Sequence, residues 1–266
     1  ERSVWEKGLK KDKRFLAALR MDPLLIHWDS SWKRLKSWGY DVEQALTEKT
    51  LAEVRRFLAD WVKKMDAVYM AVSLESDFRF PEDSAQGKLI ENCVLPVCRE
   101  QDIPLALMIG VKRQVNPDLK LAGDSVGKAD INAVSYLCAH YPHNKFMVTM
   151  LSRENQHELC VTARKFRNLM IFGCWWFLNN PSLIDEITRM RFEMLGSSVI
   201  PQHSDARVLD QLVYKWAHSR RIIASVLCEK YRDLMDTGWV LTGEEIRRDV
   251  NKLFGGTFEE FLNKKF

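Results

Sequence analysis

The 266 residues are 46% hydrophobic and 29% charged, which is ordinary for a globular protein and allows one large domain. The net charge of +4 is small for this length, so it predicts neither a nucleic-acid groove nor a membrane patch. No apolar run reaches the length of a membrane span, and no two of the six cysteines have C-x-x-C spacing. We therefore expect a single domain over residues 1–266, cytoplasmic and with reduced cysteines, that binds neither nucleic acid nor membrane.

Short apolar runs, each bounded by turn signals or by a helical pattern, predict the strands of a sheet. The runs occupy residues 15–19, 67–74, 104–111, 145–151, 168–172 and 198–202. Their near-continuous apolarity is typical of strands buried on both faces, as in parallel sheets. Helical patterns separate them, and the clearest one covers residues 51–65, with Thr47 as a plausible N-cap. Residues 112–128 are rich in Gly, Pro and charge, and are predicted as a long loop.

About six strands that alternate with helices indicate an α/β fold with a parallel sheet and helices outside it. No glycine-rich phosphate-binding motif follows any of the strands, which disfavours a nucleotide-binding doubly wound fold. A (β/α)8 barrel needs eight strands. We therefore predict an incomplete (β/α)8 TIM barrel of about six βα units, followed by C-terminal helices. Because unpaired strand edges promote association, we also expect a homo-oligomer.

Polar and aromatic side chains follow three of the predicted strands. Arg20 ends the first strand, and Trp175 and Trp176 follow the fifth. The sixth strand is followed by the cluster Gln202, His203, Ser204, Asp205 and Arg207, immediately before a helical pattern. In parallel α/β folds the loops after the carboxyl ends of the strands build the functional site, so these side chains are candidates for one.

Two structural alternatives compete with this interpretation. Asp205 or Ser204 could serve only as the N-cap of the following helix, because short polar side chains are preferred there. Arg20 could form an ion pair with Asp22 or with another acid of the loop. The two adjacent tryptophans would point to opposite sides of a strand, so at most one would normally face a pocket.

Several stretches of the sequence resemble one known family. They read FLAALRMDPLL, YMAVSL, MIGVK, KFMVTMLSRENQHEL, LMIFGCWWFLNNP and IPQHSDARVLDQLVYKWAHSR. Together they resemble the uronate isomerases, which are glucuronate isomerases and divergent relatives of the amidohydrolase superfamily. The resemblance covers essentially the whole chain and is most specific over residues 172–220. It implies a (β/α)8 barrel that interconverts D-glucuronate with D-fructuronate, and D-galacturonate with D-tagaturonate, in uronic acid catabolism.

The resemblance also implies roles for individual residues. Asp205 matches the acid that lies at the metal and handles protons, so it is expected as a metal ligand and catalytic residue. Arg207 matches the arginine that stabilises the enediolate-like charge, and Arg20 the arginine that binds the substrate carboxylate. Trp175 and Trp176 are expected to form part of the pocket wall. The small-molecule partner is then a uronic acid.

Family members carry a His-x-His pair on the first strand that helps to hold a divalent metal, commonly zinc. This sequence has no such pair. The resemblance therefore implies the C-terminal portion of a family member, without the first two barrel strands, and zinc held by the full-length enzyme rather than by this chain alone. Two alternatives stay open: a non-catalytic fragment of such an enzyme, and a metal-dependent amidohydrolase. The second is disfavoured because none of the predicted strand ends offers a histidine among Arg20, Lys112, Ser152 and Trp175.

Overall fold

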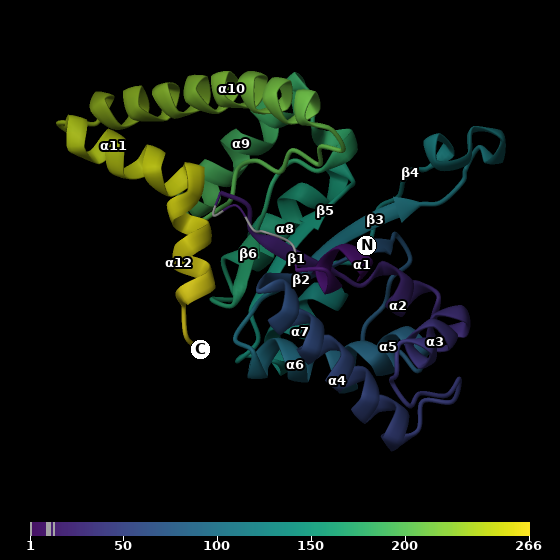
Figure 1. Ribbon diagram of the computed structural model, residues 1–266. Helices are drawn as coiled ribbons and strands as arrows, with labels where there is room; N and C mark the ends of the chain where they lie inside the picture. Colours follow the sequence, from purple (N-terminus) through teal and green to yellow (C-terminus); the bar gives the residue numbers. More distant parts are fainter. Residues whose placement is uncertain (1, 9–11, 13) are drawn as a thin grey trace.

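A computed structural model describes residues 2–8, 12 and 14–266 (Figure 1). Six strands form one sheet in the order β1-β2-β3-β5-β6, and β4 pairs with β3 outside this path. The strands are β1 Ala17–Arg20, β2 Ala67–Glu75, β3 Leu105–Lys112, β4 Ser125–Val126, β5 Phe146–Met150 and β6 Leu169–Ile171. The five strands of the path are parallel. Among the described residues the sheet does not close on itself. Its parallel strands, separated in the sequence by helices, confirm the predicted α/β class.

Two of the strand predictions were wrong. Residues 198–202 form no strand; only Ile200 bridges Phe172 in parallel, through an N–H donated to Ile171 O and a carbonyl that accepts from Gly173 N. The following Pro201 has no N–H with which to continue the ladder. The sixth strand is instead β4, an antiparallel partner of β3 within the segment that we predicted as a loop throughout.

The helices alternate with the strands as the pattern predicted. They are α1 Arg2–Glu6, α2 Asp22–Ile26, α3 Trp28–Ser37, α4 Glu48–Met65, α5 Ala85–Leu89, α6 Leu95–Glu100, α7 Asn132–His140, α8 Gln156–Ala163, α9 Pro181–Leu195, α10 Leu209–Asp236, α11 Gly243–Asn251 and α12 Thr257–Asn263. Thr47 is the N-cap of α4, as expected, and accepts a hydrogen bond from Thr50 N. Along the described ranges, no helix is both long and apolar enough to cross a membrane.

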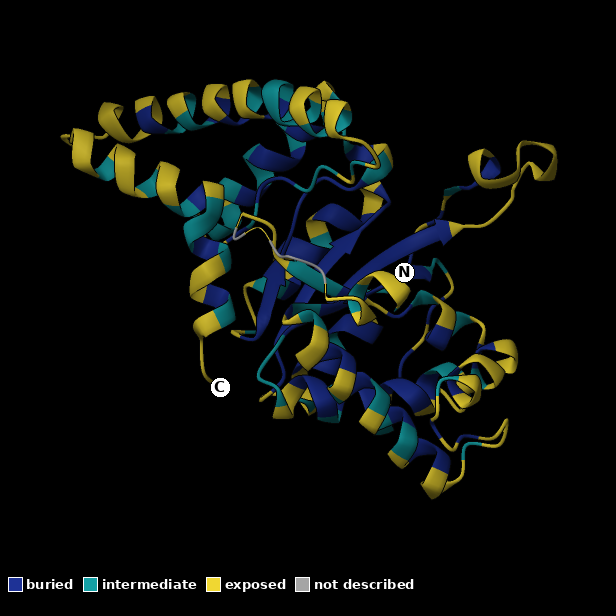
Figure 2. Ribbon diagram, in the orientation of Figure 1, coloured by how far each residue is buried: buried dark blue, intermediate teal, exposed yellow. Residues whose placement is uncertain are grey.

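Both faces of the sheet are buried (Figure 2). On β2, Met70 and Val72 face the larger core beneath the helices, whereas Tyr69 and Ala71 face a second, smaller apolar cluster. This alternation follows from the two-residue period of a strand. The second cluster is covered in part by α12, whose Phe258 lies edge-to-face with Tyr69 at 6.4 Å between ring centroids.

The C-terminal helix lies at the amino ends of the strands. The buried Lys145, directly before β5, donates to the carbonyl of Leu262 at 2.5 Å and pairs with Asp102 at 2.9 Å. Asp102 in turn pairs with Lys265. These contacts fix α12 at the amino ends of the strands. The carboxyl ends of the strands are left for the candidate site.

Candidate functional site

Parallel pairing of the strands brings the predicted site residues to the carboxyl ends of the strands. Arg20 is the last residue of β1. Trp175 follows β6 by a few residues, and Asp205 follows the Ile200 bridge to that same strand end. Three segments that are far apart in the sequence therefore lie at the carboxyl ends of the strands, as the loops of a parallel sheet do.

Arg20 is held by a bidentate ion pair, one of the two alternatives left open above. Its Nε and Nη2 donate to the Asp22 carboxylate at 2.8 and 2.7 Å, and Nη2 also donates to Ser73 Oγ at 3.0 Å. The hydrogen bond to Asp22 raises the pKa of Arg20, and the negative charge of Asp205 adds to this effect. The Arg20 side chain is nevertheless 53% exposed, so part of the guanidinium remains accessible in a fixed orientation.

Asp22 gives the first testable prediction. Burial alone would raise its pKa, but the Arg20 pair and the Ser73 N–H outweigh burial and hold the pKa of this carboxyl below its ordinary value of 3.8. A lowered folded-state pKa stabilises the fold at pH values above the unfolded-state pKa, and this stabilisation disappears as the pH falls through the folded-state pKa. We expect Asp22→Asn to lower the free energy of unfolding at pH 7, and the difference from wild type to shrink below pH 3.8.

Urea unfolding at several pH values measures this difference. The matched control is Asp12→Asn, which breaks a bidentate pair with Arg14 that is exposed to solvent. Solvent screening makes such surface pairs weak, so the control should change the free energy of unfolding little. Equal losses in the two variants would contradict the structural role that we assign to the Asp22 pair.

The capping alternative for Asp205 and Ser204 was wrong. Helix α10 begins at Leu209, and its N-cap is Val208, which makes no side-chain cap hydrogen bond. Asp205 is exposed and adopts a left-handed backbone conformation with φ 45°. Lys215 Nζ donates to the carbonyls of Ser204 and Asp205 at 2.8 and 3.2 Å, so the first turns of α10 hold the loop in place. The Asp205 side chain therefore has no part in starting the helix.

His203 lies in this cluster, as its place in the polar run after the sixth predicted strand indicated, although the family resemblance gave it no role. Its ring lies edge-to-face with Phe172 at 5.2 Å, and its Nδ1 is buried without a hydrogen-bond partner among the described residues. Burial lowers the pKa of His203, the charge of Asp205 opposes this, and the charges of Arg20 and Lys215 reinforce it. In the sequence, His203 is marked by its position two residues before Asp205 in the same polar run.

Gly173 makes room for this histidine. It has φ 64°, and a Cβ at this position would lie 2.0 Å from the Cβ of His203. Its N–H donates to Ile200 O at 2.7 Å, and its carbonyl accepts from Arg191 Nη1 at 2.8 Å. Arg191 is buried and also donates to Gln156 Oε1 at 3.0 Å, so the end of β6 is fixed from both sides.

The remaining predicted residues differ in their exposure. Trp175 is 3% exposed and packs into the apolar cluster beside Phe172, which leaves it little surface for a pocket wall. Trp176 is partly buried and stacks on Phe177 at 4.6 Å. Arg207 is exposed, and its backbone N–H donates to Gln211 Oε1 at 2.9 Å. Of the two tryptophans, Trp176 is thus the better candidate for the wall of the substrate pocket.

The residues at this edge do not form a metal site by themselves. In the part of the chain that the structure describes, no group of three or more His, Cys, Asp or Glu side chains is placed to hold an ion. Asp205 would supply one carboxylate ligand, whereas a zinc site commonly needs at least three protein ligands. The donor set that is present therefore does not fit a complete metal centre.

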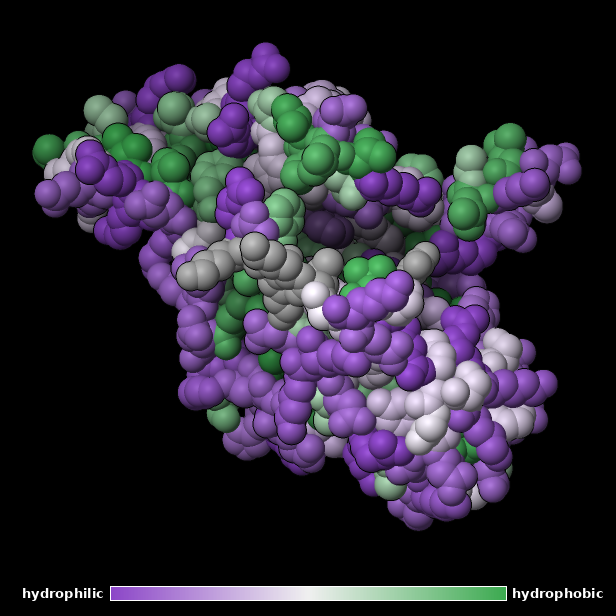
Figure 3. Space-filling model, viewed as in Figure 1, coloured by the Kyte–Doolittle hydropathy of each residue, from purple (hydrophilic) through white to green (hydrophobic). Residues whose placement is uncertain are grey.

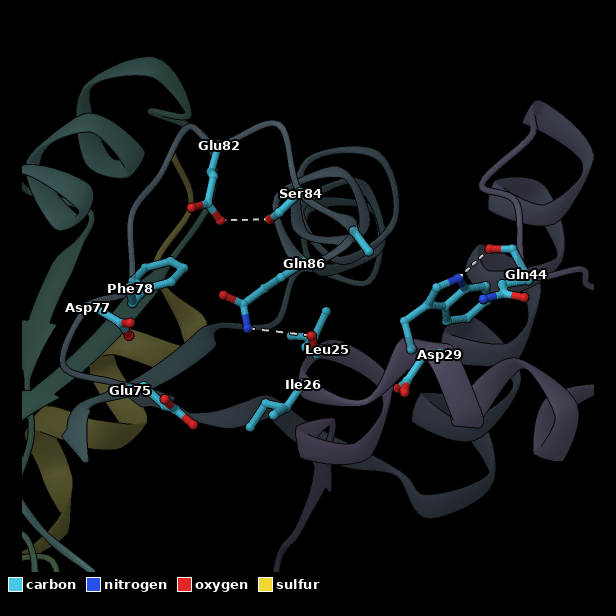
Figure 4. A pocket seen from close by; sticks show the side chains of 12 residues that line it. Leu25, Ile26, Asp29, Gln44, Glu75, Asp77, Phe78, Glu82, Ser84 and Gln86 are labelled. Carbon is cyan, nitrogen blue, oxygen red and sulfur yellow. Dashed lines mark hydrogen bonds between the residues drawn. The ribbon is translucent and has the colours of Figure 1, made fainter. Parts of the chain in front are cut away.

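A separate cleft of about 630 Å³ lies between α2, α3 and the loop after β2 (Figure 4). Its walls include the acidic side chains of Asp29, Glu75, Asp77 and Glu82. Within it Glu82 accepts a hydrogen bond from Ser84 at 2.7 Å, and Gln86 donates to Leu25 O at 3.4 Å. The negative charge of this cleft would repel a substrate carboxylate. The carboxyl ends of the strands, where Arg20 lies, are therefore the better place for an anionic ligand.

The chain was also compared with known proteins. No family model matches it, and neither does any curated protein. Among solved structures, a uronate isomerase from Bacillus halodurans has 58% sequence identity and a TM-score of 0.97, over 100% of this chain and 63% of that one. A uronate isomerase from Thermotoga maritima has 15% identity and a TM-score of 0.79, over 98% and 64% of the two chains, and is similar in fold alone. The chain thus spans less than two thirds of the length of either structure.

Proposed function

We propose that this chain belongs to the uronate isomerase family and takes part in the interconversion of a uronic acid with its keto isomer. The observation that carries the proposal is 58% identity, over the whole of this chain, to the Bacillus halodurans uronate isomerase. The substrates proposed are D-glucuronate, with D-fructuronate as product, and D-galacturonate, with D-tagaturonate as product. A cytoplasmic homo-oligomer of amidohydrolase type belongs to the same proposal.

The cluster at the carboxyl edge has the groups that this reaction needs. Aldose–ketose isomerisation by proton transfer removes a proton from C2 and returns one at C1, so it requires a base near both carbons. We assign that role to Asp205, whose side chain is exposed and not used as a helix cap. Arg207 is assigned to the oxyanion that develops along the way, because a cation placed there stabilises the transition state.

Arg20 is assigned to the substrate carboxylate. Asp22 and Ser73 hold its guanidinium in one orientation, while half of the side chain stays accessible. A guanidinium held in this way has lost most of its rotamer freedom before the substrate arrives, which reduces the entropic cost of binding. Trp176 is assigned to the wall of the pocket.

The proposal includes a divalent metal, with zinc the metal implied by the family. When bound, it would polarise the substrate oxygen as a Lewis acid. Asp205 would be one ligand, and the described residues do not complete the set. The roles given above to Asp205, Arg207 and Arg20 therefore involve no step at the metal.

A chain without activity of its own is the second candidate. It is favoured over a metal-dependent hydrolase because the described residues offer no metal-ligand set and because the chain covers 63% of the Bacillus halodurans enzyme. Assaying the 266-residue chain and the complete natural polypeptide side by side with glucuronate separates the two candidates. Activity in the longer protein alone would assign this chain a part of the site, and activity in neither would contradict the isomerase proposal.

The two arginines should affect the kinetics differently. Arg20 binds the carboxylate in the ground state and the transition state alike, so Arg20→Met should raise KM by about tenfold or more with a smaller change in kcat. This increase in KM is near the low end of what the loss of an ion pair costs, because the Arg20 side chain is 53% exposed to solvent. Arg207→Met should lower kcat more than it raises KM, since the charge that it meets forms only along the reaction.

Steady-state kinetics on the complete natural polypeptide test this contrast. The control is Arg14→Met, which breaks the corresponding Arg–Asp pair before β1 and should leave both constants unchanged. If Arg20→Met lost kcat while KM stayed the same, the assignment of Arg20 to the carboxylate would be wrong.

A further inference from the structure

Lys215, on α10, contacts the backbone on both sides of Asp205. The peptide group before Asp205 contains the carbonyl of Ser204, and the peptide group after it contains the carbonyl of Asp205 itself. Lys215 Nζ donates to the first carbonyl at 2.8 Å and to the second at 3.2 Å. Because peptide groups are planar, the only soft angles between these two groups are φ and ψ of Asp205. One ammonium group therefore restrains both angles, and with them the direction of the Asp205 Cα–Cβ bond.

The backbone conformation that Lys215 restrains is an uncommon one. Asp205 has φ 45°, in the left-handed region that residues other than glycine adopt only at a cost in free energy. Such conformations persist where the surrounding structure imposes them, and they cluster at functional sites. Without the two hydrogen bonds from Lys215, we expect Asp205 to relax to more favourable backbone angles, so that its carboxylate points in another direction.

The face of α10 that carries Lys215 is turned toward the loop before the helix. Ser219 lies one turn further along this face and accepts a hydrogen bond from Gln202 Nε2 at 2.8 Å. Both Ser219 and Gln202 are buried, so α10 contacts the loop at two places about one helical turn apart. Leu209 and Val213 are exposed on a different face of these turns, and apolar side chains lie over the start of α10 in Figure 3. The backbone that carries Lys215 is therefore fixed relative to the loop.

The contacts of Lys215 differ from those of an ordinary surface lysine, which would pair with a carboxylate. Both of its hydrogen bonds end at backbone carbonyls. A hydrogen bond from an ammonium group is charge-assisted, and it is stronger than one between neutral groups. The carboxylate of Asp205 takes no part in these two bonds, so Lys215 holds the backbone and leaves the side chain available for chemistry.

We propose that Lys215 is a positioning residue, which orients the Asp205 carboxylate by holding the two peptide groups beside it. The inference rests on the proposed function, because it takes Asp205 as the base of the isomerisation. A base must lie within hydrogen-bond reach of the proton that it removes, and a misplacement of about 1 Å can cost about 100-fold in rate. The contacts of Lys215 thus matter to turnover, although we assign it no contact with the substrate.

Steady-state kinetics with glucuronate on the complete natural polypeptide test the proposal. Lys215→Met keeps an unbranched side chain but removes the donors, so kcat should fall by about tenfold or more. KM should stay within about twofold of wild type, because Arg20, which is assigned to the substrate carboxylate, lies on β1 and is held by other residues. Lys215→Arg keeps a cation with N–H donors and should recover most of the lost rate. An unchanged kcat in Lys215→Met, or no recovery in Lys215→Arg, would overturn the proposal.

Lys230→Met is the matched control. Lys230 is a lysine of the same helix, but it pairs with Glu193 of α9 at 2.7 Å and lies far along α10 from the loop. This variant should leave kcat and KM unchanged, and its circular dichroism melt should resemble that of Lys215→Met. A loss of kcat in Lys230→Met equal to that in Lys215→Met would show that any weakening of α10 lowers turnover, which contradicts a specific role for Lys215.

A double variant shows whether Lys215 acts through Asp205. In the Asp205→Asn background the base is already lost, so adding Lys215→Met should change kcat by less than about threefold. Losses that multiply would show that Lys215 acts independently of Asp205, and would overturn the positioning role. Near-normal turnover in Asp205→Asn alone would instead contradict the proposed function, and the inference with it.

Tryptic cleavage after Arg207 provides a readout that needs no activity. Arg207 is exposed and lies two residues after Asp205, so cleavage there reports local opening of the loop. Lys215→Met should be cleaved after Arg207 about fivefold faster than wild type or more, whereas Lys230→Met should be cleaved at the wild-type rate. Cleavage of Lys215→Met at the wild-type rate would overturn the inference, whatever happens to kcat.

Discussion

Replacing Gly173 with alanine should lower the free energy of unfolding by about 2–5 kcal/mol, the sum of a left-handed backbone penalty and an overpacking penalty. Gly173 has φ 64°, which L residues other than glycine rarely adopt. The added Cβ would also lie 2.0 Å from His203 Cβ and 2.6 Å from His203 N. The backbone cannot relax easily, because Gly173 is bonded to Ile200 on one side and to Arg191 on the other.

Gly196→Ala is the control for this experiment. Gly196 has a similar φ of 60°, but an added Cβ there would find no atom within 4 Å. This variant should show only the penalty of its own backbone conformation, φ 60° and ψ −132°, about 1–3 kcal/mol. Denaturant unfolding of the two variants under the same conditions isolates the contact with His203. Equal losses would show that His203 does not pack against Gly173 as described.

Asp205→Asn should reduce turnover of glucuronate by about a hundredfold or more, in line with losing a general base. The substitution keeps the size of the side chain but removes its charge and its basicity. Because Asp205 caps no helix and is exposed, the free energy of unfolding should change little, and the loss should appear in kcat.

Asp210→Asn provides the comparison, measured in the complete natural polypeptide. Asp210 is also exposed and lies five residues further on, in the first turn of α10. It should retain near-normal turnover. Near-normal turnover in Asp205→Asn would remove this residue from the proposed mechanism, whatever the effect at position 210.

The sequence by itself determined the elements whose signals are local. The apolar runs at 67–74, 104–111 and 145–151 became β2, β3 and β5. Thr47 caps the helix that follows it, because a cap is a contact between residues three positions apart. The run from Phe172 to Arg220 was specific enough to indicate the family, and the Bacillus halodurans structure bears this out.

Only the tertiary structure decided the features that depend on a distant partner. Residues 198–202 are apolar enough for a strand, but β6 offers pairing only around Phe172, so one bridge forms. The two residues of β4 are strand only because β3 lies alongside them. The packing of the His203 ring depends on the absence of a side chain at Gly173 and on the ring of Phe172.

The orientation of Arg20 shows the same limit. Asp22 could be proposed as a partner from its spacing, but Ser73, from the neighbouring strand, could not. Strand pairing places Ser73 beside the Arg20 side chain, because Arg20 lies opposite Ala71 in the register of β1 and β2. Residue types near strand ends can be read from the sequence. Contacts between segments far apart in the chain decide which of these residues lie together at the carboxyl ends of the strands. The same contacts decide which side chains stay exposed there.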